Sequence, residues 1–178
     1  MGMSKKIKSV NSKEDLVGMG YKIKINTTTN FGHLYKEIYY WMTHHHYKWH
    51  ELTYGVIEFP KGGKRLEILW RGIKHADDYS DYVLEVHIAA GISDVKVELE
   101  NGKTAKLQNG THEFRIGATI QKNTDVWDGK PFAETQAKLY EMMIRDRLEH
   151  QKDELYTEAH KFIDHMKMLL KYYPETDK

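Results

Sequence analysis

The chain has 178 residues, 40% of them hydrophobic and 30% charged, a composition typical of one globular domain with its own core. It contains no cysteine, which excludes disulfides, thiolate metal sites and a cysteine nucleophile. Its 27 basic and 26 acidic residues almost cancel and form no block of like charge, so nothing in the sequence indicates nucleic-acid binding.

The N-terminal region predicts no targeting or membrane segment. Residues Met1–Lys6 are not followed by an apolar run of signal-peptide length, and no stretch approaches the roughly 18 apolar residues that span a bilayer. We therefore expect a cytoplasmic protein. Residues 1–20 are polar and without a clear period, which predicts a flexible arm before a single domain over residues 21–173.

A strand and a helix are expected first. Tyr21, Ile23 and Ile25 alternate with polar residues, which predicts a strand with one buried face. Residues Thr27–Asn30 then offer N-cap side chains, and apolar residues recur at helical spacing from residue 31 to about His45.

Beyond residue 47 the hydrophobic period changes to two. Turns are predicted at residues 60–63 and 77–81, and the cleanest alternation runs from Tyr82 to Ala90. Asn101–Gly102 predicts a tight hairpin, and Asn109–Gly110 a further turn between short strands. Together these signals predict a curved antiparallel sheet of about six to seven strands within residues 21–124, packed on one face.

The C-terminal region predicts one long helix over residues 131–173. Pro131 suits a first helical turn, Pro174 ends the pattern, and no glycine or proline lies between them. We expect a continuous or gently bent helix. At about 1.5 Å per residue it would be roughly 60 Å long, whereas a compact chain of this size is about 40 Å across.

Residues 149–154 are all polar where apolar residues are due. Either the helix breaks there and folds back, or its distal half projects from the sheet with its apolar side chains exposed. Monomers rarely tolerate such a patch, and a two-fold dimer is the commonest way to cover it. We therefore predict a homodimer through residues 155–173, and a folded monomer after truncation at Gln151. The predicted interface residues are Tyr156, Phe162, Ile163, Met166, Leu169 and Leu170.

The order of strand, helix, meander of about six strands and long helix resembles the helix-grip architecture of START and polyketide-cyclase-like proteins. The resemblance covers roughly residues 21–173 and rests on topology, because that superfamily has no short diagnostic motif. The chain departs from it in having one helix, not two, between its first two strands. Residues 78–82 and 139–147 also resemble small archaeal proteins of no assigned function.

This resemblance implies a cavity between the sheet and the C-terminal helix that binds a lipid-like or aromatic ligand. The chain supplies 4 tryptophans and 12 tyrosines that could line it, although aromatic residues at periodic positions are also typical of a packed core. The candidate ligand-binding residues are Trp70, Tyr82, His112, Phe114, Tyr140 and Met143.

A histidine cluster at residues 44–46 and 50 is the candidate metal site, because imidazoles bind zinc, copper or nickel. Successive helical residues point about 100° apart, so at most two of the three consecutive histidines can share one ion. The candidate ligands are His44, His46 and His50. The alternative is a favourable interaction of these rings with the helix C-terminal dipole. No cofactor is predicted.

Charged residues on the strands are expected to form a cross-strand ladder on the face opposite the core. They are Glu67, Arg71, Glu85, His87, Glu113 and Arg115. His112 differs because it shares the core face, where it is either a hydrogen-bonded strand-end histidine or an acid–base residue.

Three functions remain open from the sequence. The leading hypothesis is a non-catalytic module that binds an apolar or aromatic ligand. The second is an interaction protein that dimerises or recruits a partner through its C-terminal helix. The third is an enzyme or metal-binding protein that uses His112 or the histidine cluster.

Overall fold

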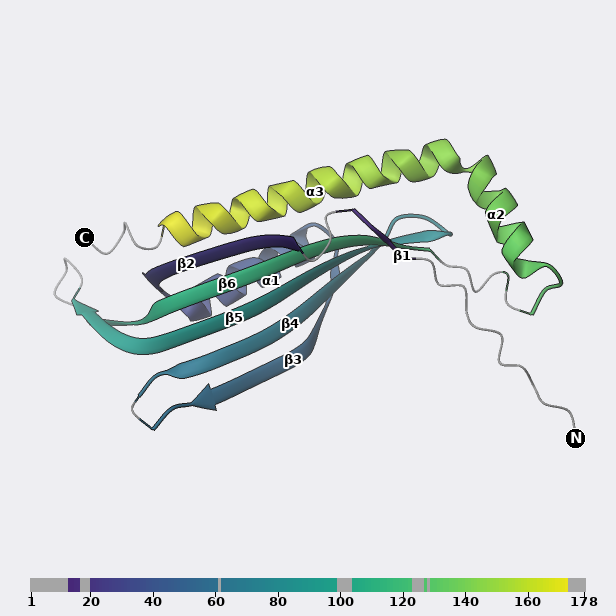
Figure 1. Ribbon diagram of the computed structural model, residues 1–178. Helices are drawn as coiled ribbons and strands as arrows, with labels where there is room; N and C mark the ends of the chain where they lie inside the picture. The colour runs from purple at the N-terminus through teal and green to yellow at the C-terminus, as the bar shows by residue number, and fades with distance from the viewer. Residues whose placement is uncertain are drawn as a thin grey trace, which may run out of the picture.

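A computed structural model describes residues 13–16, 20–60, 62–98, 104–122, 127 and 129–172. The protein is α+β, with an antiparallel sheet and a long C-terminal helix (Figure 1). The strands are β1 (Lys13–Asp15), β2 (Tyr21–Thr29), β3 (Lys48–Glu58), β4 (Lys64–His75), β5 (Ser80–Glu98) and β6 (Thr104–Lys122). The helices are α1 (Phe31–His44), α2 (Ala133–Met143) and α3 (Arg145–Tyr172).

The described strands pair in the order β6, β5, β4, β3, and both β1 and β2 pair with β6. Because β5 occupies one edge of β6 along its whole length, β1 and β2 must follow each other along the other edge. The sheet is therefore narrower than the six to seven strands we expected. Part of the predicted N-terminal arm belongs to this sheet, since β1 pairs with residues 119–121.

The strands β5 and β6 are longer than the alternation predicted. The expected turn at Asn109–Gly110 is wrong, because β6 continues through both residues without interruption. Gly110 is needed here for a close approach, since a Cβ at this position would overlap the carbonyl oxygen of Gly91 in β5. The predicted hairpin at Asn101–Gly102 lies outside the described residues.

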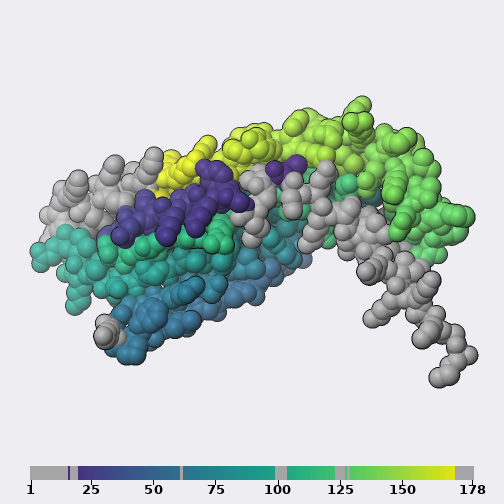
Figure 2. Space-filling model, in the orientation of Figure 1, coloured from purple at the N-terminus to yellow at the C-terminus, as the bar shows by residue number. Residues whose placement is uncertain are grey.

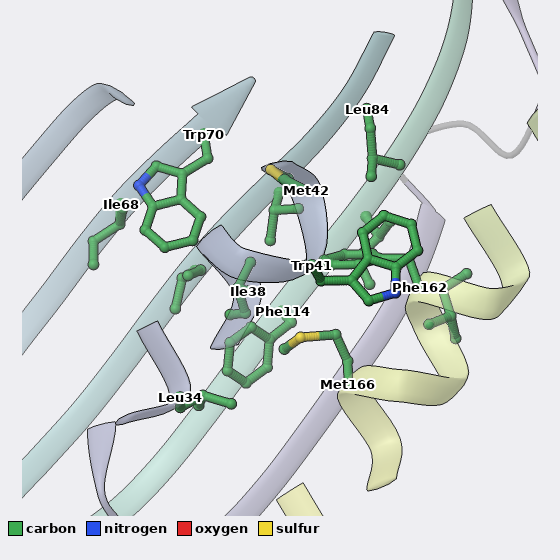
Figure 3. Close-up of a cluster of buried hydrophobic side chains, with 14 of the residues drawn as sticks. Leu34, Ile38, Trp41, Met42, Ile68, Trp70, Leu84, Phe114, Phe162 and Met166 are labelled. Carbon is green, nitrogen blue, oxygen red and sulfur yellow. The ribbon is translucent and has the colours of Figure 1, made fainter. Parts of the chain in front are cut away.

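One face of the sheet carries the core, and α1 and α3 cover it. In Figure 1, α3 runs along β2 and β6, and α1 lies behind them against the sheet. Figure 3 shows how Ile38 of α1, Phe114 of β6 and Met166 of α3 meet between the two layers. Further buried residues of this core are Leu34, Met42, Ile68, Leu84, Ile88, Ile116, Ile120, Leu155 and Phe162.

Helix α1 begins and ends close to the predicted residues. The Asn30 side chain caps it by accepting a hydrogen bond from the His33 amide at 3.0 Å. The helix ends at His44, and His46 takes a left-handed conformation with φ 64°, which turns the chain into β3.

The C-terminal helical region is divided, and the division is not where the polar residues 149–154 stand. It falls at Ile144, between α2 and α3, and α3 continues through residues 149–154. The expectation of one continuous helix is therefore wrong. The helix end predicted at Tyr173 and Pro174 lies outside the described residues.

Two of the polar residues 149–154 form hydrogen bonds to the end of the sheet and the turn before it. Gln151 is buried, accepts a hydrogen bond from Ser80 Oγ at 2.8 Å and donates one to Asp77 at 2.8 Å. Glu154 accepts a hydrogen bond from the Tyr82 hydroxyl, also at 2.8 Å. These contacts let α3 remain on the sheet where apolar packing stops.

Candidate functional site

The six predicted ligand-binding residues do not line one cavity. Trp70, His112 and Phe114 are buried in the core, and the side chains around them occupy the space between the sheet and the helices (Figure 3). Tyr82 is buried at the end of the sheet, bonded to Glu154. No cavity described here is lined by more than one of these four residues.

The other two predicted ligand-binding residues lie on α2, away from the core. Tyr140 makes edge contact with the Tyr79 ring, with centroids 5.0 Å apart, and Met143 is exposed to solvent. They therefore do not converge with Trp70 or Phe114.

The predicted metal ligands also lie apart. His44 ends α1, His46 lies in the turn, and His50 lies on β3 opposite Arg71 of β4. No group of three or more histidine, aspartate or glutamate side chains converges within the described residues to hold a metal ion. His45, which is not one of the predicted ligands, bonds through Nδ1 to the Trp41 carbonyl oxygen at 2.8 Å and stacks on its indole.

The residues predicted for a helix-mediated dimer are, with one exception, part of this chain's own core. Phe162, Ile163 and Met166 are almost completely buried, and Leu169 and Leu170 are buried with them. Only Tyr156 is exposed. The premise of that dimer, an exposed apolar helix, is wrong because α3 lies along the sheet for most of its length (Figure 1).

The predicted charge ladder is present on the face that α1 and α3 leave uncovered. Arg71 donates to Glu85 from Nε at 2.7 Å, and Lys22 lies 2.9 Å from Glu113. These pairs join neighbouring strands, as expected of a structural ladder.

A second polar network joins α3 to the ends of β4 and β5. Lys74 donates to Glu158 at 2.9 and 3.0 Å, and the Tyr47 hydroxyl donates to the same carboxylate at 3.1 Å. Burial and this carboxylate raise the pKa of the Tyr47 hydroxyl far above its ordinary value. A similar bond to Glu154, together with burial, raises the pKa of Tyr82. These phenols stay protonated at neutral pH, so they serve as hydrogen-bond donors and not as bases.

The groove beside this network, about 540 Å³ in volume, is open and lined mainly by charged and polar side chains. Its Lys74, Glu154 and Glu158 are already engaged with one another or with tyrosines. These three charged groups are therefore already paired within the protein.

The strand β3 holds a feature that the sequence interpretation missed. It is the last strand of the sheet order, so in the described part of the chain no strand pairs with its outer edge. Residues 52–57 carry no charge. The exposed apolar side chains on and just after this strand are Leu52, Tyr54, Val56, Ile57 and Phe59, and we call them the β3 patch. The uncharged run was visible in the sequence, but the edge position was not.

A hollow of about 210 Å³ adjoins the β3 patch on the core side of the sheet. Tyr54 and Val56 line it together with Phe31, the first residue of α1, and Ile92 of β5. Tyr54 and Val56 stand opposite core residues of β4 but remain exposed.

No helix in the described ranges is long and apolar enough to cross a membrane. Comparisons with protein-family models, with curated proteins and with solved structures found no match.

Proposed function

We propose that this protein is a non-catalytic interaction protein that forms a homodimer by pairing β3 with β3 of a second copy. The observation that carries the proposal is the β3 patch, an uncharged and apolar edge strand that is exposed along its second half. A strand edge of this kind is a ready template for another strand.

The second half of this edge lacks most of the features that keep natural edge strands from pairing. Such strands usually carry lysine, proline or inward-pointing charges. Between Leu52 and Ile57 the chain has none of these, and the only protective irregularity is a bulge between Glu51 and Thr53. The bulge lies at the start of the patch, so residues 53–58 remain regular and available for pairing.

A second copy fits this edge by symmetry. Antiparallel pairing about Gly55 would place Tyr54 opposite Val56 of the partner copy, and Thr53 opposite Ile57. Glu58 would lie beside the bulge at Leu52, so no like charges would meet among the paired residues. An isologous contact of this kind closes on itself and makes a discrete dimer.

The hollow beside the patch supports a protein partner over a free apolar ligand. Its volume of about 210 Å³ is below the roughly 300 Å³ at which small-molecule pockets begin. A side chain from the partner strand fits such a space. The helix-grip likeness also remains a proposal, supported by the long helix on one face of an antiparallel sheet.

The test compares two single substitutions at equally exposed apolar positions. Ile57 of the patch is 58% exposed and Met168 of α3 is 57% exposed. We expect the wild type to sediment as a dimer at micromolar concentration. Ile57→Lys should weaken dimerisation by about tenfold or more, since it replaces roughly 1.5–3 kcal/mol of apolar burial with a charge.

Met168→Lys is the matched control and should leave the dimer intact. Both variants should keep the circular dichroism of the wild type, because neither side chain belongs to the core. A wild type that sediments as a monomer throughout the micromolar range would refute self-pairing, as would equal weakening by both substitutions.

A further inference from the structure

Helix α2 presents a second apolar surface at one end of the molecule. Figure 1 shows it turned away from the axis of α3, and in Figure 2 it forms the green lobe at that end. Phe132, Leu139, Met142 and Met143 are all exposed, with Phe132 at 81% and Met143 at 84%. We call these four side chains the α2 stripe.

The α2 stripe faces away from the body of the protein. Ala137 is the buried residue of α2, so it marks the side that faces the body. At about 100° per residue, Leu139 and Met142 lie on the opposite side of the helix from Ala137. The outermost sector of α2 therefore holds apolar side chains and Thr135, and no charge.

The charged residues of α2 lie outside the α2 stripe, and the acids lie farther from it than the lysine does. Glu141 turns to the body, where it accepts hydrogen bonds from Tyr79 and Lys122, both at 2.9 Å. Glu134 lies on the same side of the helix as Glu141, whereas Lys138 lies between these acids and the stripe. Lys138 is thus nearer to the α2 stripe than Glu134 and Glu141 are.

Phe132 has a backbone conformation that residues with a side chain rarely adopt. It is left-handed, with φ 59° and ψ 33°, and its side chain caps nothing. This conformation is strained for a residue other than glycine. The strain accompanies an aromatic ring that is directed into solvent and not into the core.

We propose that the α2 stripe docks on an anionic lipid surface, with Phe132, Leu139 and Met143 inserted among the acyl chains. A helix that lies on a membrane has an apolar face flanked by basic residues and directs its acids elsewhere. On α2 one basic residue, Lys138, flanks the apolar face, and both acids lie farther from it. The contact is peripheral, and it uses a different element from the β3 patch.

Vesicle flotation of the full chain tests this proposal. We expect the wild type to float with vesicles of phosphatidylcholine and phosphatidylglycerol, and less with phosphatidylcholine alone. Leu139→Glu should reduce binding by about tenfold or more, because it removes an inserted side chain and adds a repelled charge. Lys138→Gln should reduce binding by roughly fivefold, since each basic group near an anionic surface contributes about 1 kcal/mol.

Two controls make the outcome decisive. Met168→Glu changes an equally apolar exposed residue on α3 and should float like the wild type. Ile57→Lys should do the same, which separates this surface from the proposed dimer edge. A wild type that stays unbound at low salt would overturn the proposal and leave a protein partner as the alternative occupant. Equal binding by Leu139→Glu and Met168→Glu would also overturn it.

Discussion

Two glycines on neighbouring strands, Gly91 of β5 and Gly110 of β6, differ in whether they tolerate a side chain. A Cβ on Gly110 would overlap the Gly91 carbonyl oxygen and lie 2.9 Å from Ile92 Cα, whereas a Cβ on Gly91 would meet nothing within 4 Å. We expect Gly110→Ala to lower the free energy of unfolding by about 3 kcal/mol, because two backbones must move apart. Gly91→Ala should change it by less than about 1 kcal/mol. Urea unfolding of both variants checks this, and equal losses would contradict it.

His112 makes stability depend on pH. It is completely buried, neither ring nitrogen has a hydrogen-bond partner of normal geometry among the described residues, and its ring stacks near Phe31. Burial lowers the pKa of His112, and the Thr27 backbone opposes this only in part. The folded state therefore favours the neutral ring, while the unfolded chain takes up a proton below about pH 6.5.

The stability contributed by neutral His112 is complete above about pH 6.5 and is lost as the pH falls below that value. We expect the melting temperature of the wild type to fall between about pH 7 and pH 5, and His112→Leu to flatten that decline. Burial also lowers the pKa of His165, so this residue could contribute to the same decline. The melting temperature of His165→Gln, measured over the same pH range, separates its contribution from that of His112. Burial raises the pKa of Asp77, but its hydrogen bonds outweigh this effect and lower the pKa. Asp77 therefore does not account for a loss of stability between about pH 7 and pH 5. Parallel pH curves for wild type and His112→Leu would contradict the assignment.

At the scale of elements, α3 is one wall of the core and not a detachable arm. Phe162 packs against Trp41 of α1, with ring centroids 4.7 Å apart, and is completely buried. Phe162→Ala should therefore lower the free energy of unfolding by about 3–5 kcal/mol. Met168→Ala, at an exposed position of the same helix, should change it by about 0.5 kcal/mol or less.

For the same reason, truncation after Gln151 should unfold the sheet instead of leaving a folded monomer. Loss of Leu155, Phe162 and Met166 would expose the central residues of β6 to water. Circular dichroism and thermal melts of the two substitutions and the truncation would measure this. A truncated chain with a cooperative melt would show that α3 is dispensable.

The junction of α2 and α3 is held by contacts with the turn before β5. Tyr79 bonds to Glu141 at 2.9 Å on one side of Ile144, and Asp77 pairs with Arg147 at 3.1 Å on the other. Both partners come from the turn before β5. This turn holds two successive helices at an angle without any glycine or proline at the junction.

At the scale of the whole molecule, the sheet, α1 and α3 share one core cluster. None of them buries its apolar face without the others, so we regard the described region as one cooperative unit. The two exposed apolar surfaces, the β3 patch and the α2 stripe, lie on the elements that this core does not fully cover. Changes there should alter association more than stability.

Most local elements of this protein could be predicted from its sequence. Alternation from Tyr82 to Ala90 and the helical period from Phe31 to Met42 are produced by burial of one face, so they can be read without a partner. The charge ladder on the uncovered face was predicted for the same reason, and Asn30, the observed N-cap, was among the four candidates Thr27–Asn30. These features depend on residues close in sequence or on the direction of a side chain from its strand.

Contacts between residues far apart in sequence fix which elements lie at an edge, where the last helix breaks and what its polar residues do. Gln151 is polar because Ser80 and Asp77, far away in sequence, meet it in space. An Asn-Gly pair often makes a turn, but Gly110 lies within β6. A residue without a Cβ is needed there because the Gly91 carbonyl oxygen of β5 lies so close. The edge position of β3, and with it the proposed interface, follows from the pairing of distant strands. Strand pairing is a long-range property that local periodicity does not contain.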